Sequence, residues 1–171
     1  MIRYTRFKFC PSCGGRQIER FQEYGMRCAG CGYLYFHNAA SAVSAIIEAR
    51  QGIILITRKE APRRGYLDLP GGFVGHRETL EEALQREIQE ELNLTVKDLR
   101  YFGSFPNRYD YKGVTYFTID TVFTCRAVGL SSMVPKEEVS GISILNPGEI
   151  DPQRLAFLSV RKALQKYGAG K

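Results

Sequence analysis

The most constraining segment of the chain is 72–94, GFVGHRETLEEALQREIQEELNL, in which a loop containing glycine runs into a helical pattern. If Thr79 caps this helix and each residue turns by about 100°, apolar side chains share one broad face that should pack on a core. That face comprises Leu80, Ala83, Leu84, Ile88 and Leu92. Glu87 and Glu91 project within the same apolar arc, and Glu90 lies at its edge. Carboxylates therefore stand where burial is expected.

Burying these acids requires a compensating cation. An unpaired buried carboxylate is costly, and two carboxylates within reach of each other also repel. Oxygen ligands that leave positions for water and phosphate suit Mg²⁺ or Mn²⁺ better than zinc. The alternative is a surface helix whose acids meet the helix dipole or pair with Arg86, but Glu90 and Glu91 lie near the C-terminal end, where the dipole disfavours them. The pattern therefore predicts a divalent metal site.

The same segment resembles the Nudix box, G-x5-E-x7-R-E-U-x-E-E-x-G-U, in which U is aliphatic. The matching positions are Gly72, Glu78, Arg86, Glu87, Ile88, Glu90, Glu91 and Leu94. Asn93 replaces the last glycine, but Asn tolerates the left-handed conformation that ends such a helix, so a mild effect is expected. Leu69-Pro70-Gly71 also resembles the family's lead-in. The resemblance implies a Mg²⁺-dependent hydrolase of a nucleoside diphosphate linked to another group.

The roles of the box acids follow from this resemblance. Glu87, Glu90 and Glu91 would hold one or more Mg²⁺ ions, and the ions would activate a water that attacks phosphorus in line. Glu90 or a carboxylate outside the box would take the proton. Arg86 is expected to orient an acid at i±4 spacing, either Glu82 or Glu90.

Four further positions are candidates for the same site. Glu78 precedes the helix and, by resemblance, helps to hold the loop or a metal through water. Gly71 has no side chain to block a close approach, so its carbonyl could bind a metal. Glu137 and Glu138 lie in a polar segment before an apolar run and are candidates for a further metal ligand or base. A solvated acidic turn is the alternative for that pair.

The N-terminal part contains two C-x2-C pairs at a separation typical of zinc ribbons. The cysteines are Cys10, Cys13, Cys28 and Cys31. Gly14 and Gly32 follow the pairs and allow the tight turns that aim backbone N–H groups at sulfur. Two disulfides are the alternative, but nothing near Met1 resembles a signal peptide, so a reducing cytoplasm and zinc are favoured. Four thiolates would close the tetrahedral shell, which predicts a structural zinc.

Composition indicates two compact units. We expect a zinc ribbon at residues 1–36, too small to fold without its metal, and one domain at residues 37–171. No apolar run is long enough to span a membrane. The net charge is +6, and the ribbon has an excess of basic residues. These are Arg3, Arg6, Lys8, Arg16, Arg20 and Arg27, against Glu19 and Glu23. A phosphate-rich small molecule, a nucleic acid or a merely solubilising surface would each explain that charge.

The larger unit has a mixed secondary-structure pattern. Strands are expected at 42–49, 53–57, 67–69, 73–74, 99–105, 115–128 and 142–145, with Cys125 as a core residue. A closing helix is expected at 152–167, with four packing positions: Leu155, Leu158, Val160 and Leu164. Many strands with few helices predict a mixed sheet flanked by helices. This α/β class resembles the α/β/α sandwich of the Nudix fold.

A zinc ribbon directly before a Nudix box resembles NADH pyrophosphatases. Those enzymes carry S-Q-P-W-P-F-P-x-S after the box, but residues 103–111 here read GSFPNRYDY, which argues against strict NADH specificity. Aromatic side chains can stack on a base, and arginine can bind phosphate. The substrate-binding candidates are therefore Phe105, Arg108 and Tyr109, with Tyr111 as a further aromatic and Phe36 and Tyr66 outside this segment. Ordinary packing is the alternative for each aromatic residue.

The sequence is compatible with three functions. The preferred one is hydrolysis of the diphosphate linkage in NADH, ADP-ribose or a related dinucleotide or nucleotide sugar. The second is an RNA-directed function, either cap removal or nucleic-acid binding by the ribbon. The third is a non-catalytic nucleotide-binding regulator, against which the intact acids of the box argue. Family members are often homodimers, so the resemblance is compatible with a homodimer.

Overall fold

A computed structural model of the chain describes residues 7–136 and 138–170. Arg3, Arg6 and Glu137 therefore lie outside the described residues. The chain separates into two compact units, Met1–Ala39 and Ala40–Lys171. Within the described residues, no helix combines the length and the apolar character needed to cross a membrane.

The first unit contains a small antiparallel sheet. Its strands are β1 (Ile18–Phe21), β2 (Gly25–Cys28) and β3 (Leu34–Phe36), in the spatial order β1-β2-β3. One side of β2 is closed off from solvent, because Met26 and Cys28 are both fully buried. The sheet thus places the second cysteine pair next to a very small apolar centre.

The second unit is built on a seven-stranded sheet. Its strands are β4 (Ala40–Ala49), β5 (Gly52–Arg58), β6 (Leu67–Asp68), β7 (Gly71–Phe73), β8 (Thr95–Tyr111), β9 (Val114–Val128) and β10 (Val139–Leu145). The main path is β10-β5-β4-β9-β8, with β6 paired to β5 and β7 paired to β4. The pair β4–β9 is parallel and the other pairs are antiparallel, so the sheet is mixed.

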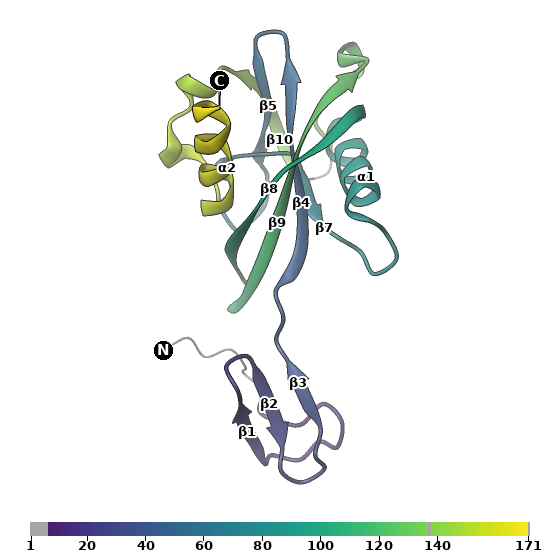
Figure 1. The fold of residues 1–171 in the computed structure, drawn as a ribbon, viewed down its shortest axis with the longest axis vertical. Coiled ribbons are helices and arrows are strands. Elements are labelled where there is room, and N and C mark those ends of the chain that lie inside the picture. The colour runs from purple at the N-terminus through teal and green to yellow at the C-terminus, as the bar shows by residue number, and fades with distance from the viewer. Residues whose placement is uncertain (1–6, 137, 171) are drawn as a thin grey trace. The chain divides into compact units, whose positions relative to one another are not determined.

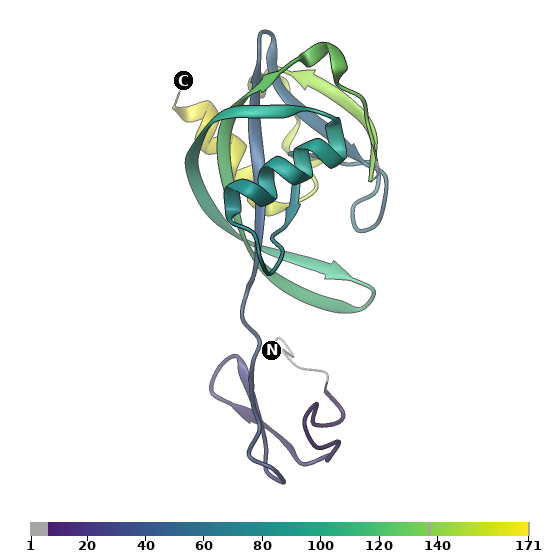
Figure 2. The ribbon, with the colours of Figure 1, turned by 90° about the vertical axis from the view of Figure 1, so that its right-hand side faces the viewer.

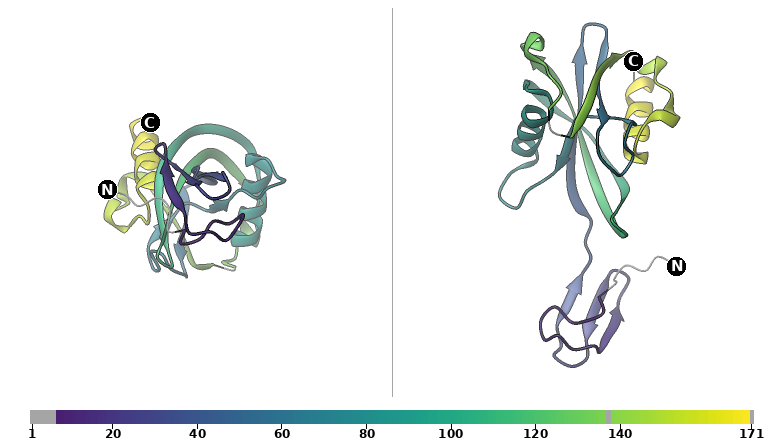
Figure 3. Two further views of the ribbon diagram at one scale, coloured as in Figure 1. Left: turned by 90° about the horizontal axis from the view of Figure 1, so that it is seen from below. Right: turned by 180° about the vertical axis from the view of Figure 1, so that it is seen from behind.

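Two α-helices cover opposite faces of this sheet (Figure 1). They are α1 (Leu80–Leu92) and α2 (Leu158–Ala169), and the 3-10 turns are η1 (Leu130–Ser132), η2 (Pro147–Glu149) and η3 (Pro152–Arg154). Figure 2 shows α1 lying across one face, and the rear view in Figure 3 shows α2 on the opposite side. Ile54 and Ile56 of β5 join the core beneath α1, whereas Ile53 and Leu55 join the core beneath α2. The predicted α/β/α sandwich is confirmed.

Most predicted elements are present, often longer than expected. The hairpin of β4 and β5 turns at Arg50–Gln51 beside Gly52, where Ala49 pairs with Gly52. The strand predicted at 99–105 extends over the whole of β8, and Cys125 is buried in the core, as predicted.

The closing helix was predicted to begin too early. The segment starts with η3, and Ala156 N then donates to Leu67 O at 2.8 Å, so this stretch lies parallel to β6 and is paired with it. The α-helix begins only at Leu158. Leu158 is 55% exposed, so its predicted packing role is wrong, because its side chain lies on the solvent side of the first turn. The other three predicted packing positions, Leu155, Val160 and Leu164, are buried.

Candidate active site

Local sequence signals fix both ends of α1. Thr79 Oγ1 accepts from Glu82 N at 3.2 Å, and Thr79 N donates to Glu82 Oε2 at 2.8 Å, which together form a capping box. Asn93 ends the helix with φ 55° and ψ 37°, the left-handed conformation expected there. Between these ends the apolar face of α1 packs on the sheet, and Glu91, on the same face, is only 8% exposed.

Arg86 gathers three carboxylates of the box. Its Nε and Nη2 donate to the two oxygens of Glu78 at 3.0 and 2.7 Å. Its Nη1 donates to Glu87 Oε1 at 2.8 Å and to Glu90 Oε2 at 2.9 Å. Its Nη2 also reaches the Phe73 carbonyl at 3.1 Å. The guanidinium fork thus ties the loop before α1, the helix itself and β7 together.

These contacts decide between the two predicted partners of Arg86. Glu90 is confirmed, whereas Glu82 uses its carboxylate in the helix cap instead. Glu78, which Arg86 holds on both oxygens, has its pKa lowered to about 2, chiefly by those hydrogen bonds and then by Gly75 N–H. Glu78 is therefore ionised throughout the neutral pH range and holds the loop.

The glycines of β7 bring the backbone against the acids. Gly71 N donates to Glu91 Oε2 at 2.9 Å. Gly71 has φ 143°, and a Cβ there would collide with the Val43 carbonyl of β4. At Gly72 a Cβ would lie 2.5 Å from the carboxyl carbon of Glu87. Position 71 needs glycine because the backbone of β4 approaches so closely, whereas a side chain at position 72 would displace the Glu87 carboxylate.

Electrostatics at the cluster favour a cation. Burial raises the pKa of Glu91 to about 8, against the lowering effect of Gly71 N–H. Burial also raises the pKa of Glu87, although Arg86 lowers it. Glu78, Glu87 and Glu90 share the single guanidinium of Arg86, and Glu91 accepts from Gly71 N–H, so negative charge is in excess. An all-carboxylate oxygen donor set of this kind fits Mg²⁺ or Mn²⁺.

The acids open onto a cavity of about 350 Å³. The box side of its lining consists of Gly71, Gly72, Glu87, Glu90 and Glu91, and the other walls include Arg58, Asp68, Phe73, Asn107, Tyr109, Thr118, Asp120, Glu138 and Phe157. Glu138 is exposed, and its carbonyl accepts from Lys59 N at 2.8 Å. The cavity therefore has an acidic side and a side that is partly aromatic.

Tyr109 and Arg108 leave β8 in opposite directions, because side chains alternate along a strand. Tyr109 lines the cavity, with its ring 5.6 Å from those of Phe73 and Phe157. Arg108 instead pairs with Asp110 at 3.0 Å and lines a neighbouring hollow of about 550 Å³. That hollow shares Phe157 with the cavity, so the two are adjacent.

Of the remaining three predicted substrate residues, Phe105 and Tyr66 do not line this cavity, and Phe36 belongs to the first unit. Phe105 packs against the core beneath α2. Tyr66 lies in the loop after β5, with the Arg63 guanidinium 5.5 Å from its ring centre. Phe36 belongs to the ribbon sheet, where its ring meets that of Phe21 edge-on at 6.0 Å.

Several lining residues were missed by the sequence reasoning. Asp68 is 6% exposed and its Oδ2 accepts from Arg58 Nη1 at 3.1 Å. Asp120 accepts from the Thr118 hydroxyl on the same strand. A usable signal existed for Asp68, because it is a lone charge between Leu67 and Leu69 in a strand pattern. The other lining residues reach the cavity through pairing between strands that are distant in the sequence. Such pairing gives no signal in the neighbouring residues.

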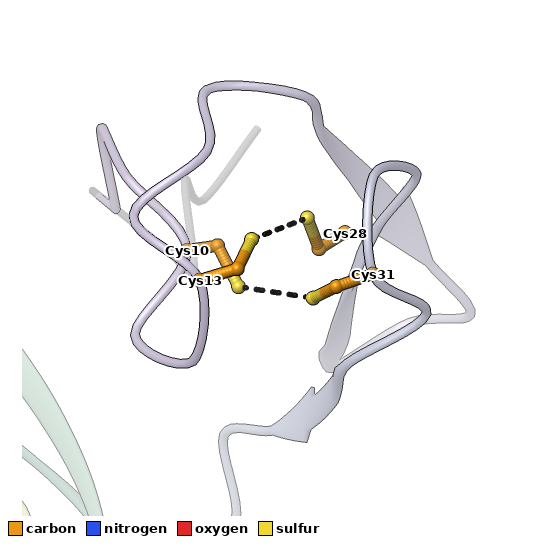
Figure 4. Close-up of side chains that lie close together, drawn as sticks. All are labelled: Cys10, Cys13, Cys28 and Cys31. Atoms are coloured by element: carbon orange, nitrogen blue, oxygen red, sulfur yellow. Dashed lines mark hydrogen bonds between the residues drawn. The ribbon is translucent and has the colours of Figure 1, made fainter.

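In the ribbon, the four cysteine sulfurs converge (Figure 4). Their Sγ atoms all lie within 4.8 Å of one another, and the pairs Cys10–Cys31 and Cys13–Cys28 are each 3.7 Å apart. Disulfide sulfurs would be about 2.05 Å apart, whereas corners of a tetrahedron with Zn–S bonds of about 2.3 Å are about 3.8 Å apart. The cluster therefore fits zinc and not disulfides.

Both cysteine pairs turn in the same way. Gly14 N donates to Cys10 O at 2.9 Å, and Gly32 N donates to Cys28 O at 2.8 Å. The two glycines have φ of 70° and 76°, so the tight turns predicted for them are confirmed. Cys10 and Cys28 are buried, whereas Cys13 and Cys31 are exposed.

Comparison with known proteins places this arrangement among Nudix proteins. The chain is 33% identical over 99 residues to the NAD-capped RNA hydrolase NudC of Vibrio parahaemolyticus, covering 58% of this chain and 38% of the relative. It is 34% identical over 117 residues to the NudC of Klebsiella pneumoniae, covering 68% and 45%. The chain thus spans less than half the length of these curated relatives.

Solved structures give the same picture. A NUDIX hydrolase from Nitrosomonas europaea superposes with a TM-score of 0.77 at 25% identity, over 96% of this chain and 92% of the other. A MutT NUDIX hydrolase from Burkholderia pseudomallei gives a TM-score of 0.66 at 25% identity, over 75% and 98%. The family model for the NUDIX domain matches residues 38–167. The chain therefore belongs to the NUDIX domain family.

Proposed function

We propose that this chain is a Mg²⁺-dependent hydrolase that cleaves the diphosphate linkage of a nucleoside diphosphate derivative, such as NADH, ADP-ribose or a related dinucleotide or nucleotide sugar. One observation carries the proposal. The box acids, gathered by Arg86 and by Gly71 N–H, face a cavity whose other wall contains Tyr109. Negative charge in excess beside an aromatic wall suits a metal-bound diphosphate with an attached nucleoside.

Each residue has a defined task in this proposal. Glu87, Glu90 and Glu91 hold Mg²⁺ or Mn²⁺, and the Gly71 carbonyl is a further candidate ligand because Gly71 lines the cavity. When bound, the metal neutralises phosphate oxygens and lowers the pKa of a coordinated water. Arg86 keeps Glu87 and Glu90 in place through hydrogen bonds of 2.8 and 2.9 Å.

The proton of the attacking water needs an acceptor. Glu90 is the first candidate, because Arg86 holds its Oε2 and its side chain is 39% exposed toward solvent. Glu138 is the second, because it lines the same cavity from outside the box. We assign Tyr109 to base stacking, since its ring lies in the cavity wall, and place Arg108 in the adjacent hollow, where it could meet a more distant phosphate.

The N-terminal unit would have a structural zinc held by its four cysteines. Four thiolates complete the tetrahedral shell, which leaves no position for substrate. Cysteines that bind zinc and form no disulfide suit a reducing compartment such as the cytoplasm. The two units would then correspond to a zinc ribbon and a hydrolase domain.

Incubation with a panel of substrates would test the proposal. NADH, ADP-ribose, dinucleotides and nucleotide sugars would be supplied with Mg²⁺, and products would be identified by mass. We expect a mononucleotide from at least one of them, and loss of that product in the Glu87→Gln, Glu91→Gln double variant. Glu81→Gln is the matched control, because Glu81 lies on the same helix and is exposed. Product release that survives the double variant would refute the site.

A second candidate is hydrolysis of a nucleotide cap on RNA. It is supported by the relatives from Vibrio parahaemolyticus and Klebsiella pneumoniae, which are NAD-capped RNA hydrolases. Exposed basic side chains at Lys8, Arg16 and Arg20 of the ribbon are compatible with it. Adding NAD-capped RNA to the panel would separate the two, because RNA binding would weaken steeply with salt, whereas turnover of a small dinucleotide would change much less.

A further inference from the structure

Arg58, at the end of β5, makes three different contacts with one guanidinium. Its Nη1 donates to Asp68 Oδ2 at 3.1 Å, and its Nε donates to the Pro62 carbonyl at 2.9 Å. Its Cζ lies 5.1 Å from the centre of the Phe157 ring. The side chains of Arg58 and Asp68 are only 15% and 9% exposed. Arg58, Asp68 and Phe157 line the cavity, whereas Pro62 lines the neighbouring hollow of about 550 Å³.

The same guanidinium also acts on Tyr109. Burial raises the pKa of the Tyr109 hydroxyl, and the charge of Arg58 and a hydrogen bond from it lower that pKa. The ring of Tyr109 is packed on that of Phe157, with their centres 5.6 Å apart and their planes tilted by 35°. Arg58 therefore packs on the Phe157 ring and acts on the hydroxyl of Tyr109. We define Tyr109 and Phe157 as the aromatic wall.

Asp68 connects this wall to the box. Its Oδ1 accepts from Leu69 N at 3.0 Å, while its Oδ2 accepts from Arg58. Gly71, three residues after Asp68, donates its N–H to Glu91. A short stretch of backbone, fixed at both ends by carboxylates, thus runs from the Arg58 ion pair to the metal-binding acids proposed above.

We propose that Arg58 is a positioning residue that fixes the aromatic wall relative to the box acids, so that one ligand engages its nucleoside and its diphosphate together. This inference rests on the proposed function. Two ligand parts held at a fixed spacing bind more tightly than either alone, because less freedom is lost on binding. A lysine at this position keeps the charge but lacks the planar fork needed to hold Asp68, Pro62 and the Phe157 face at once.

The test is equilibrium binding of ADP in the presence of Mg²⁺, measured by calorimetry on the full chain. Arg58→Lys is expected to raise Kd about tenfold. Arg50→Lys, in the exposed turn between β4 and β5, is the matched control and is expected to leave Kd unchanged. The effect of Arg58→Lys on Kd should depend on the aromatic wall. In a Phe157→Ala background, Arg58→Lys is therefore expected to raise Kd less than about twofold further.

Three results would overturn the inference. They are an unchanged Kd in Arg58→Lys, a fully additive effect in the double variant, and wild-type protein that does not bind ADP. A lower melting temperature with unchanged Kd would also overturn it, since that indicates a structural role alone. Turnover is measured separately on the substrate panel. An inactive protein whose ADP affinity responds as expected would therefore refute the hydrolase assignment and leave the positioning role intact.

Discussion

The backbone N–H of Gly71 donates to the carboxylate of Glu91 at 2.9 Å, although the two residues are 20 positions apart in the chain. The contact exists because β7 lies between β4 and α1, and because a glycine at 71 lets the strand approach the Val43 carbonyl. A single N–H does not offset the burial of Glu91, whose pKa is raised to about 8. The helix thus carries an acid that is unfavourable when ionised without a cation.

Glu91→Gln is expected to stabilise the protein at alkaline pH when Mg²⁺ is absent. The folded pKa of about 8 is above the unfolded value of about 4.3. Between these values the folded state binds more protons than the unfolded state, so wild-type stability falls as pH rises through this window. The variant lacks this loss, so its advantage should be small at pH near 5 and largest above pH near 8.

Denaturant unfolding at the two ends of this pH window would check that expectation. Glu81→Gln, on the exposed side of the first turn of α1, should show no such pH-dependent advantage. An equal gain for Glu91→Gln at both pH values would contradict burial as the cause.

Gly72→Ala should reduce metal-dependent activity without unfolding the protein. A Cβ at this position would lie 2.5 Å from the carboxyl carbon of Glu87, so the carboxylate must move. A displaced ligand is expected to raise the Mg²⁺ concentration needed for half-maximal activity roughly 10- to 100-fold.

The matched glycine is Gly168 in α2, where a Cβ would meet nothing within 4 Å. Gly168→Ala should leave activity unchanged and should add less stability than the roughly 0.5–1 kcal/mol expected in a helix interior, because Gly168 is in the last turn of α2. If wild type and Gly72→Ala needed the same Mg²⁺ concentration for half-maximal activity, the observed position of the Glu87 carboxylate would not matter for metal binding.

Arg86→Lys should lower activity roughly 10- to 100-fold, the loss typical when the partner of a metal ligand is removed. Lysine is a point charge and cannot bind both oxygens of Glu78 while also reaching Glu87 and Glu90. Steady-state kinetics at several Mg²⁺ concentrations would measure the effect. Arg77→Lys, in the exposed loop before α1, is the control and should behave as wild type. Full activity in Arg86→Lys would mean that charge alone is required.

The features predictable from sequence are those set by local chemistry. The cap at Thr79, the left-handed Asn93 and the apolar stripe of α1 depend on neighbours within a few residues, so periodicity and capping rules suffice. The conformation of each cysteine pair is also set by its neighbours, because each pair and the glycine that follows it form one turn.

Asp68 is marked in the sequence as a lone charge between Leu67 and Leu69, but its partner in the lining of the cavity could not be predicted in this way. Asp68 faces Arg58 because β6 pairs antiparallel with β5, with Ile56 opposite Asp68. Such a register depends on the whole sheet, and a two-residue strand gives no periodic signal. The late start of α2 has a similar cause, because residues after Pro152 are held against Leu67 of β6 and not by a helical pattern.

Replacements of Asn93 should rank in stability as Asn, then Gly, then Ala. Asn93 Oδ1 accepts from Lys136 Nζ at 2.9 Å and from Gln89 Nε2 at 3.2 Å, and its Nδ2 donates to Ser132 O at 3.1 Å. Gly keeps the left-handed backbone free of strain but loses these contacts. Ala loses them and adds about 1 kcal/mol of strain at φ 55°. Thermal melting would give the order, and a Gly variant above wild type would show that the side-chain contacts contribute nothing.

Cys28→Ser should remove zinc and unfold the first unit while the second keeps its own melting transition. Cys28 is fully buried next to Met26, and the three short strands around it enclose too few apolar side chains to fold alone. The second unit has separate cores on both faces of its sheet, so it does not depend on the ribbon's metal. Metal analysis should give about one zinc per chain in wild type and in Cys125→Ala, whose thiol lies in the core beneath α1. Hydrogen exchange would report which strands lose protection. Retention of zinc by Cys28→Ser, or loss of protection in β4 and β9, would contradict this separation.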